Sequence, residues 1–246
     1  MRSLIEDEGL FPTFDVRSKA PTIPIYANLG AVQLNYGYGL KECQKAVDLL
    51  AANGLILHLN SIQEVIQPEG DTNFKGLLTK IESICKYLEV PVGIKEVGWG
   101  ISAEVARMLH EVGADFIDVA GAGGTSWSQV EKYRANDPFL YELGDAFKDW
   151  GIPTTECIIN VRNELPNISL IGSGGIKNGV DAAKALSLGA DIVGFGRSLL
   201  RDATSSAERV CQTLDLIEQQ LKLAMFGIGA KSISELKSTP RIHKAY

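Results

Sequence analysis

Apolar and polar positions follow one another along this chain in a repeated order: a short apolar run, a glycine-rich or polar stretch, then a longer amphipathic segment. Short runs rich in β-branched residues are typical of strands buried on both faces, and the segments between them are typical of helices that cover a parallel sheet. The pattern therefore predicts an α/β fold. The predicted strands are the runs at 24–30, 54–60, 90–96, 114–120, 168–174 and 190–196.

The clearest crossover helices are predicted at 40–52, 102–112 and 179–188, and the last two end at Gly113 and Gly189, which suit helix C-caps. A Gly-Ala-Asp sequence, or a variant of it, precedes the strands at 54–60, 114–120 and 190–196. Such punctuation occurs in (β/α)₈ barrels and in doubly wound sheets, so it does not choose between them. A Gly-x-Gly-x-x-Gly fingerprint is absent after the first strand, which disfavours a dinucleotide-binding fold.

The number of β/α units is smaller than a closed barrel needs. A complete (β/α)₈ barrel takes roughly 250 residues, and this chain of 246 residues also contains a long segment at 124–149 and a C-terminal tail. We therefore predict one domain, residues 1–246, that forms a barrel of the (β/α)₈ TIM type with about six units, roughly two short of closure. The residues before the first strand are predicted to form a loop.

Composition narrows the class of protein. With 45% hydrophobic and 22% charged residues the chain is that of an ordinary globular protein, and 24 basic against 30 acidic residues give a net charge of −6 without a basic block for nucleic acid. The four cysteines lack the Cys-x-x-Cys spacing of a zinc site. No apolar run is long enough to span a membrane, and no signal peptide is evident. These features favour a cytoplasmic protein with neither nucleic-acid nor membrane partners.

Polar side chains gather where the second predicted strand ends. His58 and Asn60 share one face of that strand, and Gln63 and Glu64 follow directly after it. The functional groups of a parallel barrel collect at the carboxyl ends of its strands, which favours a site at this edge. The alternative is that His58 and Asn60 are hydrogen-bonded core residues, with Gln63 and Glu64 in solvent.

Lys95 ends the third predicted strand. An ammonium group is costly there unless an anion or an electron-rich ring meets it, and a phosphate or a flavin ring would do so. The alternative is an ion pair with a neighbouring carboxylate such as Glu96 or Asp118.

Two glycine-rich turns follow later strands, at 118–127 and 171–179. Glycine lets backbone N–H groups converge on an anion, and the second turn leads into a helix N-terminus, which favours phosphate. The last strands of such barrels are the usual phosphate site, and the final strand of this chain ends at Gly196 and Arg197. Tight turns are the alternative, but this position favours a phosphate-bearing cofactor.

Taken in order, these motifs resemble those of the type 2 isopentenyl-diphosphate isomerases, which are FMN-dependent (β/α)₈ barrels. The resemblance spans essentially the whole chain, and ordered motifs are more specific than any one alone. It rests on residues 20–21 with 26–31, on His58–Asn60 with Gln63–Glu64 and 67–70, and on the segments 95–98, 123–127, 173–176 and 230–236.

The resemblance implies isomerisation of isopentenyl diphosphate to dimethylallyl diphosphate, a step of isoprenoid precursor biosynthesis without net redox change. It implies reduced FMN, Mg²⁺, and NAD(P)H as the reductant of the flavin, in a homo-oligomeric enzyme. Glu64 is implied as the Mg²⁺ ligand and Gln63 as the catalytic residue beside the double bond. Arg2, His58, Asn60 and Gln63 are implied as substrate contacts, and Asn28, Lys95, Thr125, Gly174, Gly175, Ile176, Lys177, Gly196 and Arg197 as contacts of FMN.

This chain also departs from the family. The first two strands of the family, with a flavin-contacting Met-Thr-Gly-Gly turn and an Arg-Lys pair for the diphosphate, have no counterpart, so the chain resembles an N-terminally truncated barrel. Ala120 stands where a serine is frequent. Two other interpretations stay open: another FMN-dependent barrel oxidoreductase, and a non-catalytic barrel fragment. The 2-hydroxy-acid oxidases need a histidine after the sixth barrel strand, and IMP dehydrogenase-like barrels need a cysteine in that loop; the segment 119–127 contains neither.

Overall fold

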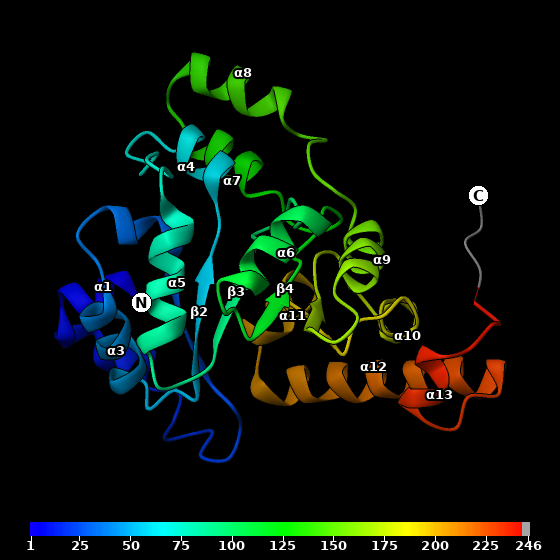
Figure 1. Ribbon diagram of the computed structural model, residues 1–246. Helices are drawn as coiled ribbons and strands as arrows, with labels where there is room; N and C mark the ends of the chain where they lie inside the picture. The colour runs from blue at the N-terminus through cyan, green and yellow to red at the C-terminus, as the bar shows by residue number, and fades with distance from the viewer. Residues whose placement is uncertain (243–246) are drawn as a thin grey trace. The chain divides into compact units, whose positions relative to one another are not determined.

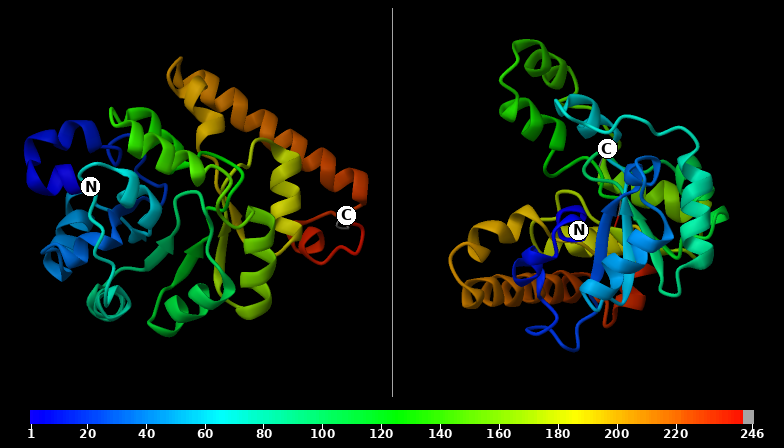
Figure 2. Two further views of the ribbon diagram at one scale, coloured as in Figure 1. Left: turned by 90° about the horizontal axis from the view of Figure 1, so that it is seen from above. Right: turned by 90° about the vertical axis from the view of Figure 1, so that its left-hand side faces the viewer.

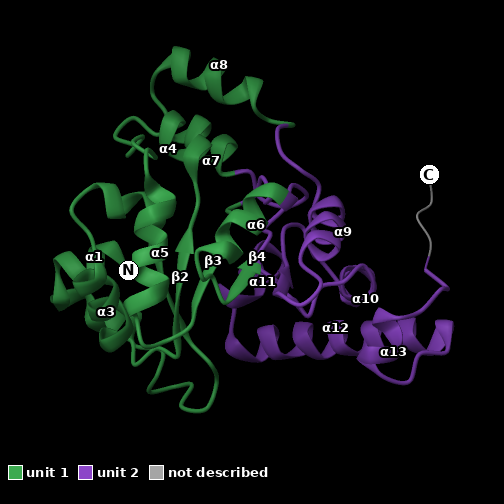
Figure 3. Ribbon diagram, viewed as in Figure 1, with its two compact units in different colours: residues 1–97, 104–117, 127–149 green, residues 98–103, 118–126, 150–246 purple. Residues whose placement is uncertain are grey.

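The computed structural model describes residues 1–242 of the chain. Two compact units are built from interleaved segments (Figure 3): the first from residues 1–97, 104–117 and 127–149, the second from residues 98–103, 118–126 and 150–246. Within the described part of the chain, every helix is too short or too polar to cross a bilayer.

Six strands form one sheet in strict sequence order, β1 to β6, and the paired strands run parallel. Their bounds are β1 Tyr26–Gly30, β2 Gly54–His58, β3 Val92–Lys95, β4 Phe116–Asp118, β5 Ser169–Gly172 and β6 Ile192–Val193. All the predicted strands are confirmed, each shorter than its apolar run. Since β1 and β6 end the strand order among the described residues, the sheet is open, and the predicted incomplete barrel architecture is confirmed.

Helices alternate with these strands, as the amphipathic pattern predicts (Figure 1). Before β4 the chain forms α1 Arg2–Glu6, η1 Glu8–Leu10, α2 Phe11–Phe14, η2 Ala31–Asn35, α3 Leu40–Leu49, α4 Ser61–Ile66, α5 Leu77–Tyr87 and α6 Ala103–Glu111. After β4 it forms α7 Trp127–Arg134, α8 Pro138–Ala146, α9 Thr154–Glu164, α10 Gly179–Ser187, α11 Arg197–Ala203, α12 Ala207–Ile228 and α13 Ile233–Lys237.

The prediction of a loop before the first strand is wrong, because residues 2–14 form α1, η1 and α2. Leu4 is fully buried where α1 packs on α3. The Asp7 side chain accepts the N–H of Gly9 and so caps η1 at 2.9 Å. Lys45 of α3 also donates to the Ile5 carbonyl at 3.1 Å and pairs with Glu8 at 2.6 Å. These contacts order a stretch too short to show helical periodicity.

The Gly-Ala-Asp lead-ins act as caps on neighbouring strands. In each case the polar side chain before one strand accepts a backbone N–H near the start of the strand beside it, which orders the amino edge of the sheet. The backbone N–H of Ile25 donates to the side-chain oxygen of Asn53 at 3.0 Å, that of Val92 to Asp115 at 2.7 Å, and that of Leu170 to Asp191 at 2.9 Å. The predicted glycine caps are also confirmed, since Gly113 and Gly189 have φ values of 97° and 120°.

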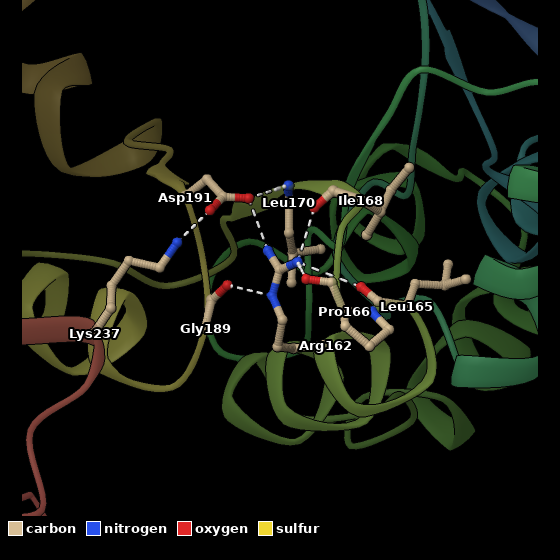
Figure 4. Close-up of polar contacts among 8 residues, drawn as sticks. All are labelled: Arg162, Leu165, Pro166, Ile168, Leu170, Gly189, Asp191 and Lys237. Atoms are coloured by element: carbon tan, nitrogen blue, oxygen red, sulfur yellow. Dashed lines mark hydrogen bonds and ion pairs between the residues drawn. The ribbon is translucent and has the colours of Figure 1, made fainter. Parts of the chain in front are cut away.

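Asp191 is the centre of a larger clamp in the second unit (Figure 4). Arg162 of α9 donates to Asp191 at 2.7 Å and to the carbonyls of Gly189, Leu165, Pro166 and Ile168, while Lys237 of α13 donates to the other carboxylate oxygen. Burial opposes ionisation, but the bonds from Lys237 and the Leu170 N–H lower the pKa of Asp191. The clamp ties α9, β5, β6 and α13 together.

Candidate substrate and cofactor sites

The carboxyl edge of β1 to β3 brings predicted site residues together in the first unit. His58 is paired in register with Gly30 on one side and with Lys95 on the other. Nδ1 of His58 lies 2.8 Å from Oδ1 of Asn28, so the Asn28 amide contacts the imidazole. His58 and Lys95 end neighbouring strands and Asn60 lies two residues after β2, so these three lie at one edge of the sheet. The expectation from the sequence also placed Thr125 at this rim, and that part stays a prediction. Thr125 belongs to the second unit and is described with it.

The environment of His58 keeps its imidazole neutral. Burial, followed by the positive charge of Lys95, lowers the pKa of His58 from 6.5 to about 4. With Nδ1 donating to Asn28, the other ring nitrogen carries a lone pair. In this tautomer the neutral ring has no N–H left to donate to an anion. The tautomer that donates from Nε2 requires the Asn28 amide to be turned over, so that its nitrogen donates to Nδ1.

Lys95 turns its ammonium group onto a backbone oxygen. Its Nζ donates to the carbonyl of Glu96 at 2.5 Å, while the Glu96 carboxylate accepts the N–H of Val97 at 2.6 Å. An ammonium group has three donors, so the bond to a carbonyl leaves Lys95 able to meet an anion as well.

The segment after β2 folds into a polar cluster around Glu64 on α4. Nδ2 of Asn60 donates to one carboxylate oxygen of Glu64 at 2.6 Å, and the backbone N–H of Asp71 donates to the other at 2.7 Å. The Asp71 carboxylate in turn accepts from Gln33 at 2.8 Å and from Arg2 at 3.3 Å. The structure thus brings three of the predicted residues, Arg2, Asn60 and Glu64, into one connected network.

Gln63, beside Glu64 on α4, faces a carboxylate that the sequence interpretation missed. Its Nε2 donates to Oε1 of Glu131 at 3.1 Å, and Arg134 bonds the same carboxylate at 3.1 and 3.2 Å. Glu131 is buried on α7, which packs with α8 against α4 (Figure 2). The sequence assigned this residue to an insertion, and a charged residue of an amphipathic helix carries no signal that it will be buried.

The first unit fits a divalent cation that shares its ligands with a substrate. Among residues 1–242, no group of three His, Cys, Asp or Glu side chains could hold a metal alone. Glu64 is partly exposed, and each of its oxygens keeps a lone pair beyond the one hydrogen bond described above. Mg²⁺ commonly takes one or two carboxylates together with substrate phosphates and water, so this donor set fits Mg²⁺.

In the second unit the two glycine-rich turns pack directly on each other. A Cβ atom on Gly174 would lie 2.2 Å from the carbonyl oxygen of Gly121, and one on Gly175 would lie 2.3 Å from that of Gly123. Both residues also have positive φ, 103° and 83°. Close packing and backbone conformation alone therefore require glycine at Gly174 and Gly175, and the alternative of tight turns accounts for these two residues.

Gly196 differs, since a Cβ there would meet nothing within 4 Å. The position before α11 is thus open, as it is at Gly37 and Gly76, and it leaves room for a ligand. The N-terminus of α10 is less suited, because the chain supplies acceptors to its N–H groups. The backbone N–H of Lys177 donates to the Asp181 carboxylate at 3.3 Å, and the backbone N–H of Gly179 donates to the side-chain oxygen of Gln220 at 2.9 Å. The acidic Asp181 would also repel a phosphate.

The loop after β4 joins the predicted Thr125 to this glycine cluster. A Cβ on Gly124 would lie 2.7 Å from the backbone nitrogen of Gly175, and one on Gly98 would lie 2.5 Å from the Thr125 carbonyl oxygen. Ala120, at the start of the loop, has a positive φ of 35°, which is unusual for a residue other than glycine. These turns therefore form one closely packed backbone cluster in the second unit.

Comparisons with known proteins agree with this architecture. A family model described as FMN-dependent dehydrogenase matches residues 49–243. Solved structures of a lactate oxidase from Pediococcus acidilactici and a GMP reductase from Trypanosoma brucei share the fold, at 19% and 18% identity and TM-scores of 0.64 and 0.57. They cover 91% and 86% of this chain, which covers 62% and 43% of theirs.

Proteins similar in sequence identify the family more specifically than the family model and the solved structures do. The isopentenyl-diphosphate delta-isomerase of Oceanobacillus iheyensis is 54% identical over 98% of this chain and 69% of its own length. Proteins with the same name from Rickettsia bellii and a Synechococcus species are 48% and 53% identical, over 96% and 92% of this chain and 69% and 65% of their own lengths. The chain thus spans about two thirds of the curated relatives it matches. Both comparisons lead to one conclusion, that the chain belongs to the FMN-dependent, type 2 isopentenyl-diphosphate delta-isomerases.

Proposed function

We propose that this chain carries the substrate site for conversion of isopentenyl diphosphate into dimethylallyl diphosphate, together with part of the FMN site. The proposal rests on two neighbouring residues of α4, the helix that follows the strand bearing His58. Gln63 carries a neutral amide, and Glu64 carries a hydrogen-bonded carboxylate. A cation and a diphosphate need the carboxylate, whereas an alkene needs an uncharged neighbour.

At the diphosphate end, Glu64 binds Mg²⁺, and the cation screens the charge of the substrate oxygens. The cationic Arg2 and Lys95 complete a polar edge that favours an anion, and His58 joins them in the tautomer that donates from Nε2, with the Asn28 amide turned to donate to Nδ1. Arg2 is partly committed to Asp71, which keeps its guanidinium near the Glu64 network. These residues bind and orient the diphosphate and take no part in breaking a carbon–hydrogen bond.

At the alkene end, Gln63 positions the double bond. Its amide nitrogen is held by buried Glu131, so the amide keeps one orientation. Bound reduced FMN supplies the acid–base chemistry that adds a proton at the terminal carbon and removes one from C2, and NAD(P)H serves to keep it reduced. An amide is a poor acid, so the contribution of Gln63 is placement.

Residues of the second unit hold the flavin. The open space at Gly196, with Arg197 beside it, suits the phosphate, and the backbone around Gly174 and Gly175 suits the ring edge. Thr125 is proposed as a further contact, while Ile176 and Lys177 contribute through the turn before α10. Oxidation of a 2-hydroxy acid is disfavoured, because the loop at 119–127 contains no histidine to take the proton.

We also propose a cytoplasmic homo-oligomer. Leu223 and Phe226 of α12 are 68% and 82% exposed, and apolar side chains so exposed favour contact between subunits. Light scattering after gel filtration measures the assembly, and a strictly monomeric chain at micromolar concentration would contradict it.

The function is tested with the purified chain and added FMN. Flavin absorbance should co-purify with the chain, and reduced FMN with Mg²⁺ should give dimethylallyl diphosphate, followed by ¹H NMR. Glu64→Gln should raise the Mg²⁺ needed for half-maximal turnover by about 10- to 100-fold and leave FMN bound. A chain that binds no flavin is the non-catalytic fragment, and loss of FMN in Glu64→Gln would move α4 to the flavin site.

A further inference from the structure

The carboxylate of Glu64 is held from two sides by donors of different kinds. One is the side chain of Asn60, which is only 4% exposed, and the other is the backbone N–H of Asp71. Because an ionised carboxylate only accepts hydrogen bonds, the nitrogen of the Asn60 amide must face it. The orientation of this amide is therefore fixed by chemistry.

That orientation leaves the amide oxygen of Asn60 buried, with no hydrogen-bond partner among residues 1–242. A buried acceptor left unpaired costs about 1–3 kcal/mol. Turning the amide over would place its oxygen against the carboxylate, where two acceptors repel. The charge-assisted bond to Glu64 outweighs the unpaired oxygen, so holding Glu64 is what Asn60 does in this structure.

The turn at Gly70 and Asp71 is built for the same carboxylate. A Cβ atom on Gly70 would lie 1.7 Å from the backbone oxygen of Glu64, so only glycine allows the chain to return this close to α4. The side chain of Asp71 is anchored by Gln33, itself buried, and its N–H is thereby directed at Glu64. The sequence Gln-Pro-Glu-Gly-Asp after α4 thus has a positioning role.

We propose that Asn60 and the Gly70–Asp71 turn act on Glu64 alone: they are positioning residues that aim its carboxylate at a divalent cation, and Asn60 is not a contact of the diphosphate. This inference deepens the proposed function and replaces the substrate-binding role expected for Asn60 from the sequence. Hydrogen bonds to a metal-ligating carboxylate typically change metal affinity by about 10- to 100-fold when lost.

The test is a double-mutant cycle on metal affinity. Mn²⁺ binding in the presence of inorganic pyrophosphate, measured by electron paramagnetic resonance, is compared among wild type, Asn60→Ala, Glu64→Gln and the double variant. Asn60→Ala should weaken Mn²⁺ about tenfold, and it should add nothing once Glu64 is already changed, since its effect passes through that carboxylate.

The matched control is Gln44→Ala. Gln44 donates to Asp48 at 2.8 Å across one turn of α3, the same amide–carboxylate spacing as Asn60 and Glu64 but on an exposed surface. Its loss should leave Mn²⁺ affinity unchanged. FMN affinity and the binding of inorganic pyrophosphate without metal should be unchanged in Asn60→Ala, whereas a general structural loss would lower all of them together.

Each outcome decides one question. If Glu64→Gln keeps wild-type Mn²⁺ affinity, the cation site of the proposed function is wrong. Two outcomes would refute only the positioning role, provided that Glu64→Gln loses Mn²⁺. One is that Asn60→Ala lowers the binding of pyrophosphate, and the other is that the effect of Asn60→Ala on Mn²⁺ affinity adds to the effect of Glu64→Gln. Should Asn60→Ala not fold, Mg²⁺ titration of ¹⁵N-labelled wild type replaces it. The Asn60 side-chain and Asp71 amide resonances should shift with Mg²⁺, and a response to pyrophosphate alone would overturn the inference.

Discussion

Acid should destabilise this protein through His58. Burial and the charge of Lys95 hold the pKa of His58 at about 4 in the folded chain, against 6.5 as its ordinary value. Because the folded pKa lies below the unfolded one, the unfolded chain binds more protons between these values. The contribution of His58 to stability is therefore complete above pH 6.5 and is lost progressively as the pH falls toward 4.

The magnitude follows from the same two values. Proton linkage over this pKa difference lowers the free energy of unfolding by about 2 kcal/mol between pH 7.5 and pH 5. The whole pKa shift corresponds to about 3 kcal/mol. Such a loss is a substantial part of the 5–15 kcal/mol typical of a folded domain.

The assay is urea unfolding at pH 7.5 and pH 5.0, followed by circular dichroism. His58→Gln keeps a side-chain amide for Asn28 but does not titrate, so its loss of stability should be about 2 kcal/mol smaller than that of wild type. His110→Gln, on the exposed surface of α6, is the control and should follow wild type. Equal losses in wild type and His58→Gln would refute the assignment of this pH dependence to His58.

Three further predictions rest on other parts of the structure. Gln63→Ala should slow turnover at least tenfold with little change in Mg²⁺ dependence, because it removes the amide held by Glu131; an unchanged turnover number would contradict its placement at the alkene. Gly174→Ala should lose FMN and several degrees of melting temperature, since its Cβ would overlap the Gly121 carbonyl at 2.2 Å, and calorimetry with flavin absorbance measures both. Asp191→Ala should cost about 1–2 kcal/mol in urea unfolding, because it removes the acceptor of the Arg162 guanidinium and the Leu170 N–H in Figure 4, and an unchanged free energy of unfolding would count against the clamp.

Much of the fold could be predicted from local pattern. Runs such as 54–60 are apolar and β-branched and predict strands, and segments such as 179–188 are amphipathic and predict helices. Strands that are apolar on both faces indicate a parallel sheet covered by these helices. Residues 2–14 were predicted as a loop because their helices are too short to show a period. Tertiary contacts order them: Leu4 is buried, and Lys45 of α3 bonds Ile5 and Glu8. The division into two compact units also has no counterpart in the composition of the chain.

The sequence by itself determined which chemical groups occur at the ends of the strands, because strand termination is local: His58, Asn60, Glu64 and Lys95 follow directly from it. Tertiary structure decided what each group does. Glu131 meets Gln63 only because α7 packs on α4, and Asp71 meets Arg2 and Gln33 although both lie far from it in the sequence. Periodicity reports which face of an element is apolar, whereas hydrogen-bond partners far apart in sequence depend on how those faces pack.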